Sequence, residues 1–248
     1  MAKTYYITTP IYYVNDKPHI GHAYTTLACD VLARFKRLDG FDVTFLTGTD
    51  EHGQKVETAA EKRGVSPQIF TDEVSQNFRD LTGQMNFSND DFIRTTEKRH
   101  KHACQEIWRR LTDRGHIRLG NYSGWYSVRD ESFYTETEVI DGKAPTGAPV
   151  EWVEEPSYFF NLSHWQKPLL DFYASNPDFV GPESRFNEVK SFVKGGLRDL
   201  SVSRASFKWG VQVPDDEERL KFISNFSGSA GYAIISARSE LKSAIFSD

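Results

Sequence analysis

Two histidines near the N-terminus stand three residues apart, in the order Pro18-His19-Ile20-Gly21-His22. This spacing is close to one helical turn, so both imidazoles are expected on one side of a helix that begins near Pro18. Proline is accepted in a first turn because its missing N–H would have no partner there. Imidazoles beside the free N–H groups of a helix start suit a phosphate. A single histidine at a helix start is usually a surface or capping residue, so the prediction of a phosphate site depends on the pair.

A second candidate is Asp50, which opens the turn Asp50-Glu51-His52-Gly53 after an apolar run. A carboxylate at a strand end, beside a phosphate-binding helix, could hold the ammonium group of an amino acid near that phosphate. Asp50 could equally be the N-cap of a helix that begins at Gln54, which is a common role for aspartate. The sequence assigns no role to Glu51 or His52.

The elements that must position these residues alternate between strand and helix. An apolar run from Tyr5 to Thr9 precedes the histidines, and a second strand is predicted from Asp42 to Leu46. Between them, apolar residues recur every three or four positions and predict a helix of about 18 residues with one buried face. The residues of this face are Ile20, Ala23, Leu27, Val31, Phe35 and Leu38. Such a crossover joins parallel strands, and ligands bind outside their carboxyl ends.

The alternation continues and then changes. Helices are predicted over 54–62, 67–83 and 97–114, with a short strand at 92–95. The apolar stripe of the last helix, Ala103, Ile107 and Leu111, is expected to face a core. Its basic residues, Lys98, Arg99, Lys101, Arg109 and Arg110, are explained as a solvated face. From Gly115, short aromatic segments between turn residues predict antiparallel strands at 116–119, 124–128, 131–134 and 150–154, followed by helices over 165–175 and 183–195.

The composition describes a globular chain with ample core. It has 248 residues, of which 38% are hydrophobic and 26% charged, and a net charge of -5. This charge argues against wrapping of nucleic acid by bulk electrostatics, so any RNA contact must be local. No apolar run is long enough to cross a membrane, so we expect no membrane partner and a cytoplasmic location. Cys29 and Cys104 have no partner at ligand spacing, and no zinc is expected.

The Pro-His-Ile-Gly-His order after a strand and loop resembles the signature of class I aminoacyl-tRNA synthetases and related nucleotidylyl transferases. Four further segments narrow the resemblance to methionyl-tRNA synthetases, over about residues 3 to 214. They are Thr8-Thr9-Pro10-Ile11-Tyr12-Tyr13, Leu46-Thr47-Gly48-Thr49-Asp50-Glu51-His52-Gly53, Gly124-Trp125-Tyr126-Ser127 and Phe192-Val193-Lys194-Gly195-Gly196-Leu197.

The resemblance implies roles for particular residues. Pro18, His19, Gly21 and His22 would bind ATP, with His19 and His22 acting in catalysis. Ile11, Tyr13 and Asp50 would bind methionine, Asp50 through the amino group. Without the family, strand-end packing is the favoured explanation of Tyr12 and Tyr13. The reaction is then ATP-dependent activation of methionine and its transfer to tRNA. Mg²⁺ is expected to arrive with ATP, and the missing cysteine pairs near Gly124 place the chain in a zinc-free branch.

The chain departs from the family's pattern in its C-terminal part. The lysine-rich Lys-Met-Ser-Lys-Ser loop is absent, and the resemblance ends near Asp216. The segment from Arg219 to Asp248 resembles the N-terminal, non-metal domain of aminopeptidase P-like proteins. Without that family, its Gly228-Ser229-Ala230-Gly231 stretch is equally explained as a flexible turn before a strand. The expected activity of this chain alone is therefore low. Two alternatives stay open: a non-catalytic remnant or binding module, and a small nucleotidylyl transferase.

The predicted fold class is α/β, the first half of a Rossmann-like nucleotide-binding domain with an inserted β-rich connective module and without the second half. The predicted divisions are residues 1–115 for the first half of the catalytic domain, 116–202 for the inserted domain, 203–216 for a return strand, and 217–248 for a tail. Without the second half, Phe45, Ile93 and the stripe of Ala103, Ile107 and Leu111 are expected to remain on the surface and to favour oligomers or aggregation.

Overall fold

The fold is taken from a computed structural model, which describes residues 3–130, 132–204, 208–214, 216 and 222–223. The chain divides into two compact units. The first contains residues 1–106 and 206–248, and the second contains residues 107–205. The chain therefore leaves the first unit and later returns to it.

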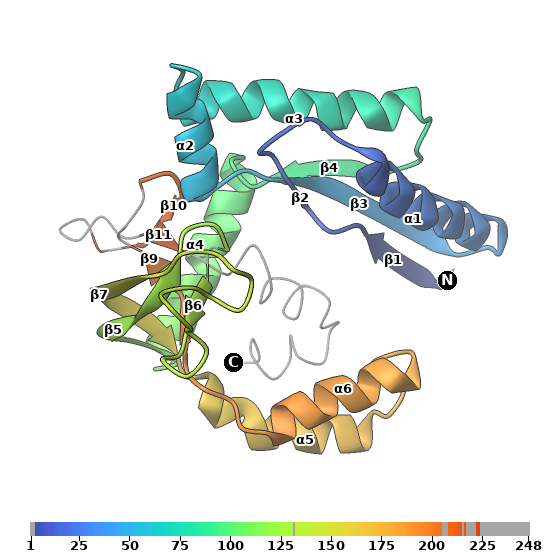
Figure 1. The fold of residues 1–248 in the computed structure, drawn as a ribbon. Coiled ribbons are helices and arrows are strands. Elements are labelled where there is room, and N and C mark those ends of the chain that lie inside the picture. Colours follow the sequence, from blue (N-terminus) through green and yellow to red (C-terminus); the bar gives the residue numbers. More distant parts are fainter. Residues whose placement is uncertain (1–2, 131, 205–207, 215, 217–221, 224–248) are drawn as a thin grey trace. The chain divides into compact units, whose positions relative to one another are not determined.

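A parallel sheet forms the centre of the first unit, with β3 as its middle strand (Figure 1). β1 pairs with the first half of β3, from Thr4 opposite Asp42 to Thr8 opposite Leu46. β2 pairs with the end of β3, and β4 lies along its other edge. The strands are β1 Thr4–Thr8, β2 Tyr12–Tyr13, β3 Asp42–Asp50 and β4 Asp91–Arg94. β3 thus runs four residues beyond the predicted Leu46, because β2 and β4 both supply hydrogen-bond partners there.

β3 and β4 approach each other closely at Gly48. Gly48 lies opposite Ile93 in the parallel register. A β-carbon at this position would lie 2.0 Å from the main-chain oxygen of Ile93. No side chain can be accommodated at that distance, so glycine is required if the two strands are to pair here.

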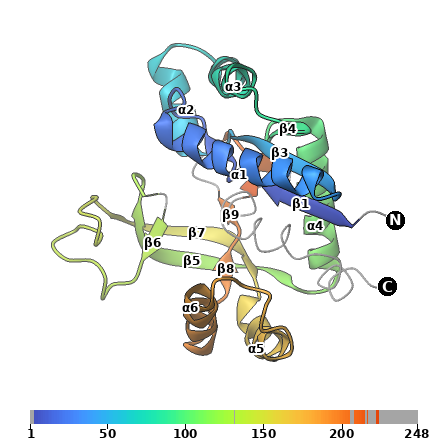
Figure 2. The ribbon, with the colours of Figure 1, turned by 90° about the vertical axis from the view of Figure 1, so that its right-hand side faces the viewer.

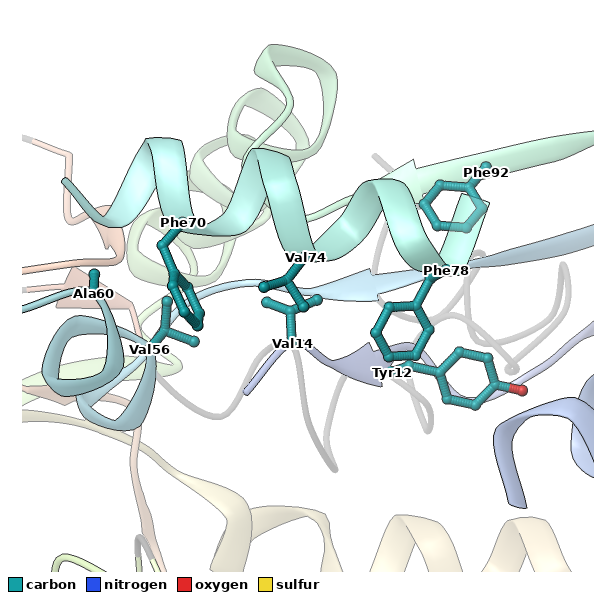
Figure 3. Packing of buried hydrophobic residues seen from close by; sticks show 8 residues of the cluster. All are labelled: Tyr12, Val14, Val56, Ala60, Phe70, Val74, Phe78 and Phe92. Atoms are coloured by element: carbon teal, nitrogen blue, oxygen red, sulfur yellow. The ribbon is translucent and has the colours of Figure 1, made fainter. Parts of the chain in front are cut away.

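The helices of the first unit follow the sequence prediction closely in extent. α1 accompanies β1 and β3 (Figure 1), and α2 and α3 pack against each other. A buried apolar cluster joins α2 and α3 to the loop after β2, as Figure 3 shows. Its members are Tyr12, Val14, Val56, Ala60, Phe70, Val74, Phe78 and Phe92. The bounds are α1 Ile20–Leu38, α2 Gln54–Lys62, α3 Pro67–Gln84 and α4 Lys98–Asp113.

The predicted buried face of α1 was wrong. Most of that stripe is exposed: Ile20 at 85%, Leu27 at 42%, Val31 at 59%, Phe35 at 55% and Leu38 at 88%. The buried residues of α1 are instead Thr26, Asp30 and Ala33. Asp30 accepts hydrogen bonds from the N–H and the hydroxyl of Ser88, both at 2.6 Å, and pairs with Arg34 at 2.7 Å. Satisfied polar groups therefore cover the inner face of α1, and its apolar stripe faces outward.

Some of the apolar residues that were predicted to remain on the surface are buried. Phe45 is fully buried in a small cluster with Ala33 and Val43. In α4 the buried residues are Trp108 and Leu111, whereas Ala103 is exposed. The exposed apolar surface of the first unit therefore includes the outer face of α1 and not Phe45.

The second unit is built on a long antiparallel pair, β5 and β7 (Figure 2). The two strands predicted at 116–119 and 124–128 are one continuous strand, because β7 pairs with it from Ile117 to Tyr126. β6 and β8 extend this sheet on either side, and α5 and α6 pack side by side. The bounds are β5 Ile117–Ser127, β6 Ser132–Tyr134, β7 Glu151–Phe160, α5 Gln166–Ser175, α6 Glu183–Lys194, β8 Leu200–Ser201 and β9 Ser203–Arg204.

After its return to the first unit, the chain contributes two short paired strands. Its strands are β10 Val211–Gln212 and β11 Phe222–Ile223, which pair antiparallel. The region predicted to resemble an aminopeptidase P-like domain lies outside the described residues, apart from β11. Within the described part of the chain, no helix is both long and apolar enough to cross a membrane.

Two glycines offer a matched test of this packing. Gly48→Ala should destabilise the fold by more than about 3 kcal/mol, because the β-carbon would collide with the backbone of β4. Gly83→Ala, in α3, meets nothing within 4 Å of the new β-carbon and should stabilise the fold by about 0.5 to 1 kcal/mol. Urea unfolding followed by circular dichroism measures both. Equal effects of the two substitutions would contradict the close approach of β3 and β4.

Candidate functional site

The two histidines cap the helix that they begin. His19 is the N-cap of α1, and its Nδ1 accepts a hydrogen bond from the N–H of Gly21 at 3.1 Å. The N–H of His19 in turn donates to Nδ1 of His22 at 3.0 Å. The rings stack, with centroids 3.8 Å apart. Because each Nδ1 accepts a hydrogen bond, each neutral ring carries its proton on Nε2, which is then available to donate to a ligand.

Pro18 was predicted to lie in the first helical turn and does not, whereas Gly21 leaves space for the ring of His19. Helix α1 begins at Ile20, so Pro18 precedes the N-cap and is not in the first turn. A β-carbon on Gly21 would lie 2.9 Å from Cε1 of His19. A side chain at this position would displace the ring of His19, which folds back over the helix start.

His22 is tied to the core through Tyr12. The hydroxyl of Tyr12 donates to the carbonyl of His22 at 3.2 Å and lies 2.7 Å from Oγ1 of Thr26. The rings of Tyr12 and His22 meet edge to face at 4.8 Å, and Phe78 lies 5.1 Å from His22. Burial, followed by the nearby His19, lowers the pKa of His22. The neutral donor form is thus favoured, and Tyr12 has the packing role that was the alternative at the sequence level.

Tyr13 and Asp50 lie side by side at the strand ends. They are register partners in the parallel pair of β2 and β3, and the N–H of Val14 donates to the carbonyl of Asp50 at 3.3 Å. Ile11 immediately precedes β2 and is half-buried. The structure therefore brings Tyr13 next to Asp50, with Tyr12, the neighbour of Tyr13, contacting the histidine cap. Asp50 ends a strand and is not the N-cap of α2, which is Gly53.

His52 lies beside Trp209, a residue that sequence reasoning did not place in the site. The two rings are 5.6 Å apart, and the N–H of Gly53 donates to the carbonyl of Trp209 at 3.0 Å. Among the described residues, Nε2 of His52 is buried without a hydrogen-bond partner. Burial, with smaller contributions from Lys101 and His100, lowers the pKa of His52 to about 3. His52 is therefore neutral.

The first turns of α4 complete the surroundings of Asp50 and His52. Sγ of Cys104 lies 3.3 Å from Nε2 of His100. Burial, and then the charge of Asp50, raises the pKa of Cys104 to about 11, so this thiol stays protonated. Burial also lowers the pKa of His100. The ammonium group of Lys101 lies 5.8 Å from the centre of a Trp209 ring.

The site thus has two sides with different chemistry. One offers Nε2 donors and the N-terminus of α1, which suit an anion. The other offers a carboxylate next to aromatic and aliphatic side chains, which suits a cationic group attached to an apolar one. Within the described residues, no group of three or more His, Cys, Asp or Glu side chains is placed to hold a metal ion.

Comparison with known proteins gives a consistent result. The sequence matches the family described as "tRNA synthetases class I (M)" over residues 5–151 and 146–233. This match extends beyond Asp216, where the sequence resemblance was predicted to end. A methionine–tRNA ligase from Rickettsia conorii is 62% identical over 238 residues, which are 94% of this chain and 47% of the relative. The ligase from Halalkalibacterium halodurans is 52% identical and is covered to 38%.

The solved structures agree with the sequence relatives. The methionyl-tRNA synthetase of Mycobacterium tuberculosis in complex with methionyl-adenylate superimposes with a TM-score of 0.86 at 49% identity, covering 97% of this chain and 48% of that one. The chain therefore spans about half the length of the relatives that it matches.

The lowered pKa of His52 predicts a pH dependence of stability. The unfolded chain takes up a proton at His52 below its ordinary pKa of 6.5, whereas the folded chain does so only near 3. The unfolded state thus binds more protons as the pH falls, and the free energy of unfolding drops. Between about pH 7.5 and pH 5, His52 alone should account for a loss of about 2 kcal/mol.

Urea unfolding of the wild type and of His52→Gln at several pH values measures this loss. The substitution should flatten the pH dependence. His102→Gln, at an exposed position of α4, is the matched control and should leave the dependence unchanged. An unaltered slope in His52→Gln would rule out the buried neutral state.

Proposed function

Because the chain belongs to the methionine-type class I tRNA synthetases, we propose that the site at the ends of β2 and β3 and the start of α1 binds methionine and ATP. The reaction is the formation of methionyl-adenylate, followed in the complete protein by transfer of methionine to tRNA. The observation that carries the proposal is the pairing of Tyr13 with Asp50 at a strand end connected through Tyr12 to the His19–His22 cap.

The methionine side of the site is Ile11, Tyr13 and Asp50. The Asp50 carboxylate accepts hydrogen bonds from the ammonium group of methionine. Ile11 and Tyr13 contact the thioether side chain, for which an aliphatic and aromatic surface is suitable because sulfur is polarizable. A relative of known structure was solved with methionyl-adenylate, which supports this assignment.

The ATP side of the site is the start of α1. His19 and His22 donate from Nε2 to the phosphates, and Gly21 allows the His19 ring to lie against the helix start. Pro18 sets the approach of the chain to this cap. A carboxylate oxygen of methionine attacks the α-phosphorus and pyrophosphate leaves. The protein contributes alignment of the two groups and donors for the charge that grows on the phosphate oxygens. His19 and His22 are the catalytic residues in this sense.

Further partners follow from the same proposal. Mg²⁺ enters with ATP, held mainly by phosphate oxygens, as is usual for this ion. tRNA supplies the acceptor in the second step. The cytoplasm is the proposed location, since translation takes place there. Zinc has no part in the proposed reaction.

A pyrophosphate exchange assay tests the activity. The chain spans about half of its relatives and has no Lys-Met-Ser-Lys-Ser motif in its sequence. Loss of a single donor around a transition state costs about a hundred- to a thousand-fold in rate. We therefore expect methionine-dependent exchange of labelled pyrophosphate into ATP to be at least about a hundred-fold slower than in a full-length relative assayed beside it. Methionine binding without exchange would identify a binding module, and robust exchange would contradict the expected impairment.

Two conservative substitutions test the assignment of the two sides. Asp50→Asn should weaken methionine binding about ten-fold and leave ATP binding nearly unchanged, because it removes the charge that meets the ammonium. His19→Asn should weaken ATP binding by a similar factor and spare methionine, since asparagine still caps the helix but lacks the Nε2 donor. Isothermal titration calorimetry with each ligand measures both. Parallel losses for the two ligands in either variant would overturn the assignment.

A further inference from the structure

Glu51 has so far no role, although it stands between Asp50 and His52. Its side chain is fully buried, with 0% exposed. A buried carboxylate costs several kcal/mol unless cations and hydrogen-bond donors satisfy it. The donors that satisfy Glu51 therefore indicate what this part of the chain is built to hold in place.

Four hydrogen bonds saturate the Glu51 carboxylate. Oε1 accepts from Oγ1 of Thr49 and from Nε of Arg94, both at 2.7 Å. Oε2 accepts from Nη2 of Arg94 at 2.9 Å and from Oγ1 of Thr96 at 2.5 Å. Arg94 is thus bidentate, the geometry that makes such a pair directional as well as strong.

The main chain of Glu51 is held at both of its polar atoms. Its N–H donates to Oγ1 of Thr95 at 2.8 Å, and its carbonyl accepts from Nε1 of Trp209. Arg94 extends the network to α3, where it bonds to Oδ1 of Asp72 at 2.6 Å. Residue 51 is therefore fixed against β4, α3 and the returning segment at once.

The neighbours of Glu51 face different surroundings from Glu51 itself. Glu51 contacts Arg94, which is bound to Asp72 of α3. Asp50 acts electrostatically on Cys104, and His52 is influenced by Lys101 and His100, all in α4. Each neighbour is joined to Glu51 by one peptide unit, so fixing residue 51 limits the backbone rotations that could move Asp50 or His52.

We propose that the Glu51–Arg94 pair is a positioning device for the methionine side of the site: it sets the place of Asp50 and His52 without touching the ligand. The proposal rests on the proposed function for the identity of the ligand, but the positioning itself does not. Among the described residues, the His19–His22 cap is held by Tyr12, Phe78 and the start of α1, and its hydrogen bonds and ring contacts do not include this pair. ATP binding therefore does not depend on the pair.

Glu51→Gln is the central test, because it keeps the size of the side chain but removes the charge and one pair of acceptor positions. Methionine affinity should fall about ten-fold, whereas ATP affinity should stay within about two-fold of the wild type. Thr96→Val, which removes a single hydrogen bond to Oε2, should also lower methionine affinity, by a smaller factor. This variant tests the proposal if Glu51→Gln does not fold. Arg63→Gln is the matched control: it breaks the exposed Arg63–Glu73 pair and should change neither affinity.

Amide hydrogen exchange supplies a readout without ligand. In Glu51→Gln, exchange at residues 50–53 should become at least about ten-fold faster, while residues 20–24 of α1 keep the wild-type rate. Equal loss of both ligands, or unchanged exchange at 50–53, would overturn the positioning role. A wild-type chain that binds no methionine would refute the proposed function instead, and the exchange experiment would still decide between a positioning pair and an ordinary buried ion pair.

Discussion

Two physical constraints on the first unit act at the carboxyl end of β3: a close approach of two strands and a buried charge. Within five residues the strand passes a point where only glycine fits, at Gly48, and reaches the buried carboxylate of Glu51. Both features require β4 to be in register, since Ile93 closes on Gly48 and Arg94 neutralises Glu51. The register of one strand pair therefore determines at once the packing of the sheet and the electrostatic balance of the site.

The sequence predicted the elements well and their faces poorly. The bounds of α2 agree with the prediction because Gly53 and Gly64 flank a short helix. The observed ends of β4 and α3 lie within one or two residues of the predicted ends. The inner face of α1 was missed for a physical reason. The periodicity of apolar residues shows which side of a helix is apolar. The side of α1 that is buried is instead determined by hydrogen bonds of Asp30 and Thr26 to groups distant in sequence. Those partners cannot be read from the pattern of α1 itself.

In the candidate site, too, the positions of residues along the elements were predicted better than their contacts. The spacing of His19 and His22 predicted that both lie at a helix start, and Asp50 was predicted at a strand end; the structure confirms both placements. Capping was the favoured explanation for a single histidine at this place, and His19 is indeed the N-cap of α1. The two roles are compatible, since capping uses Nδ1 and leaves Nε2 for a ligand. Trp209 carried no signal at all, because its relation to Glu51 spans 158 residues and depends on the return of the chain to the first unit.

That return has a consequence for the order of events during synthesis. A ribosome releases β1, β3 and β4 early, and these strands with α1 to α3 contain their own apolar clusters. The whole segment 107–205 must then be translated before Trp209 leaves the exit tunnel. Until that moment the Glu51 carbonyl and the ring of His52 lack the indole that later covers them. The surroundings of Glu51 and His52 are thus completed later than the parallel sheet, and a chain stalled within residues 107–205 would contain the His19–His22 cap before Trp209 has been synthesised.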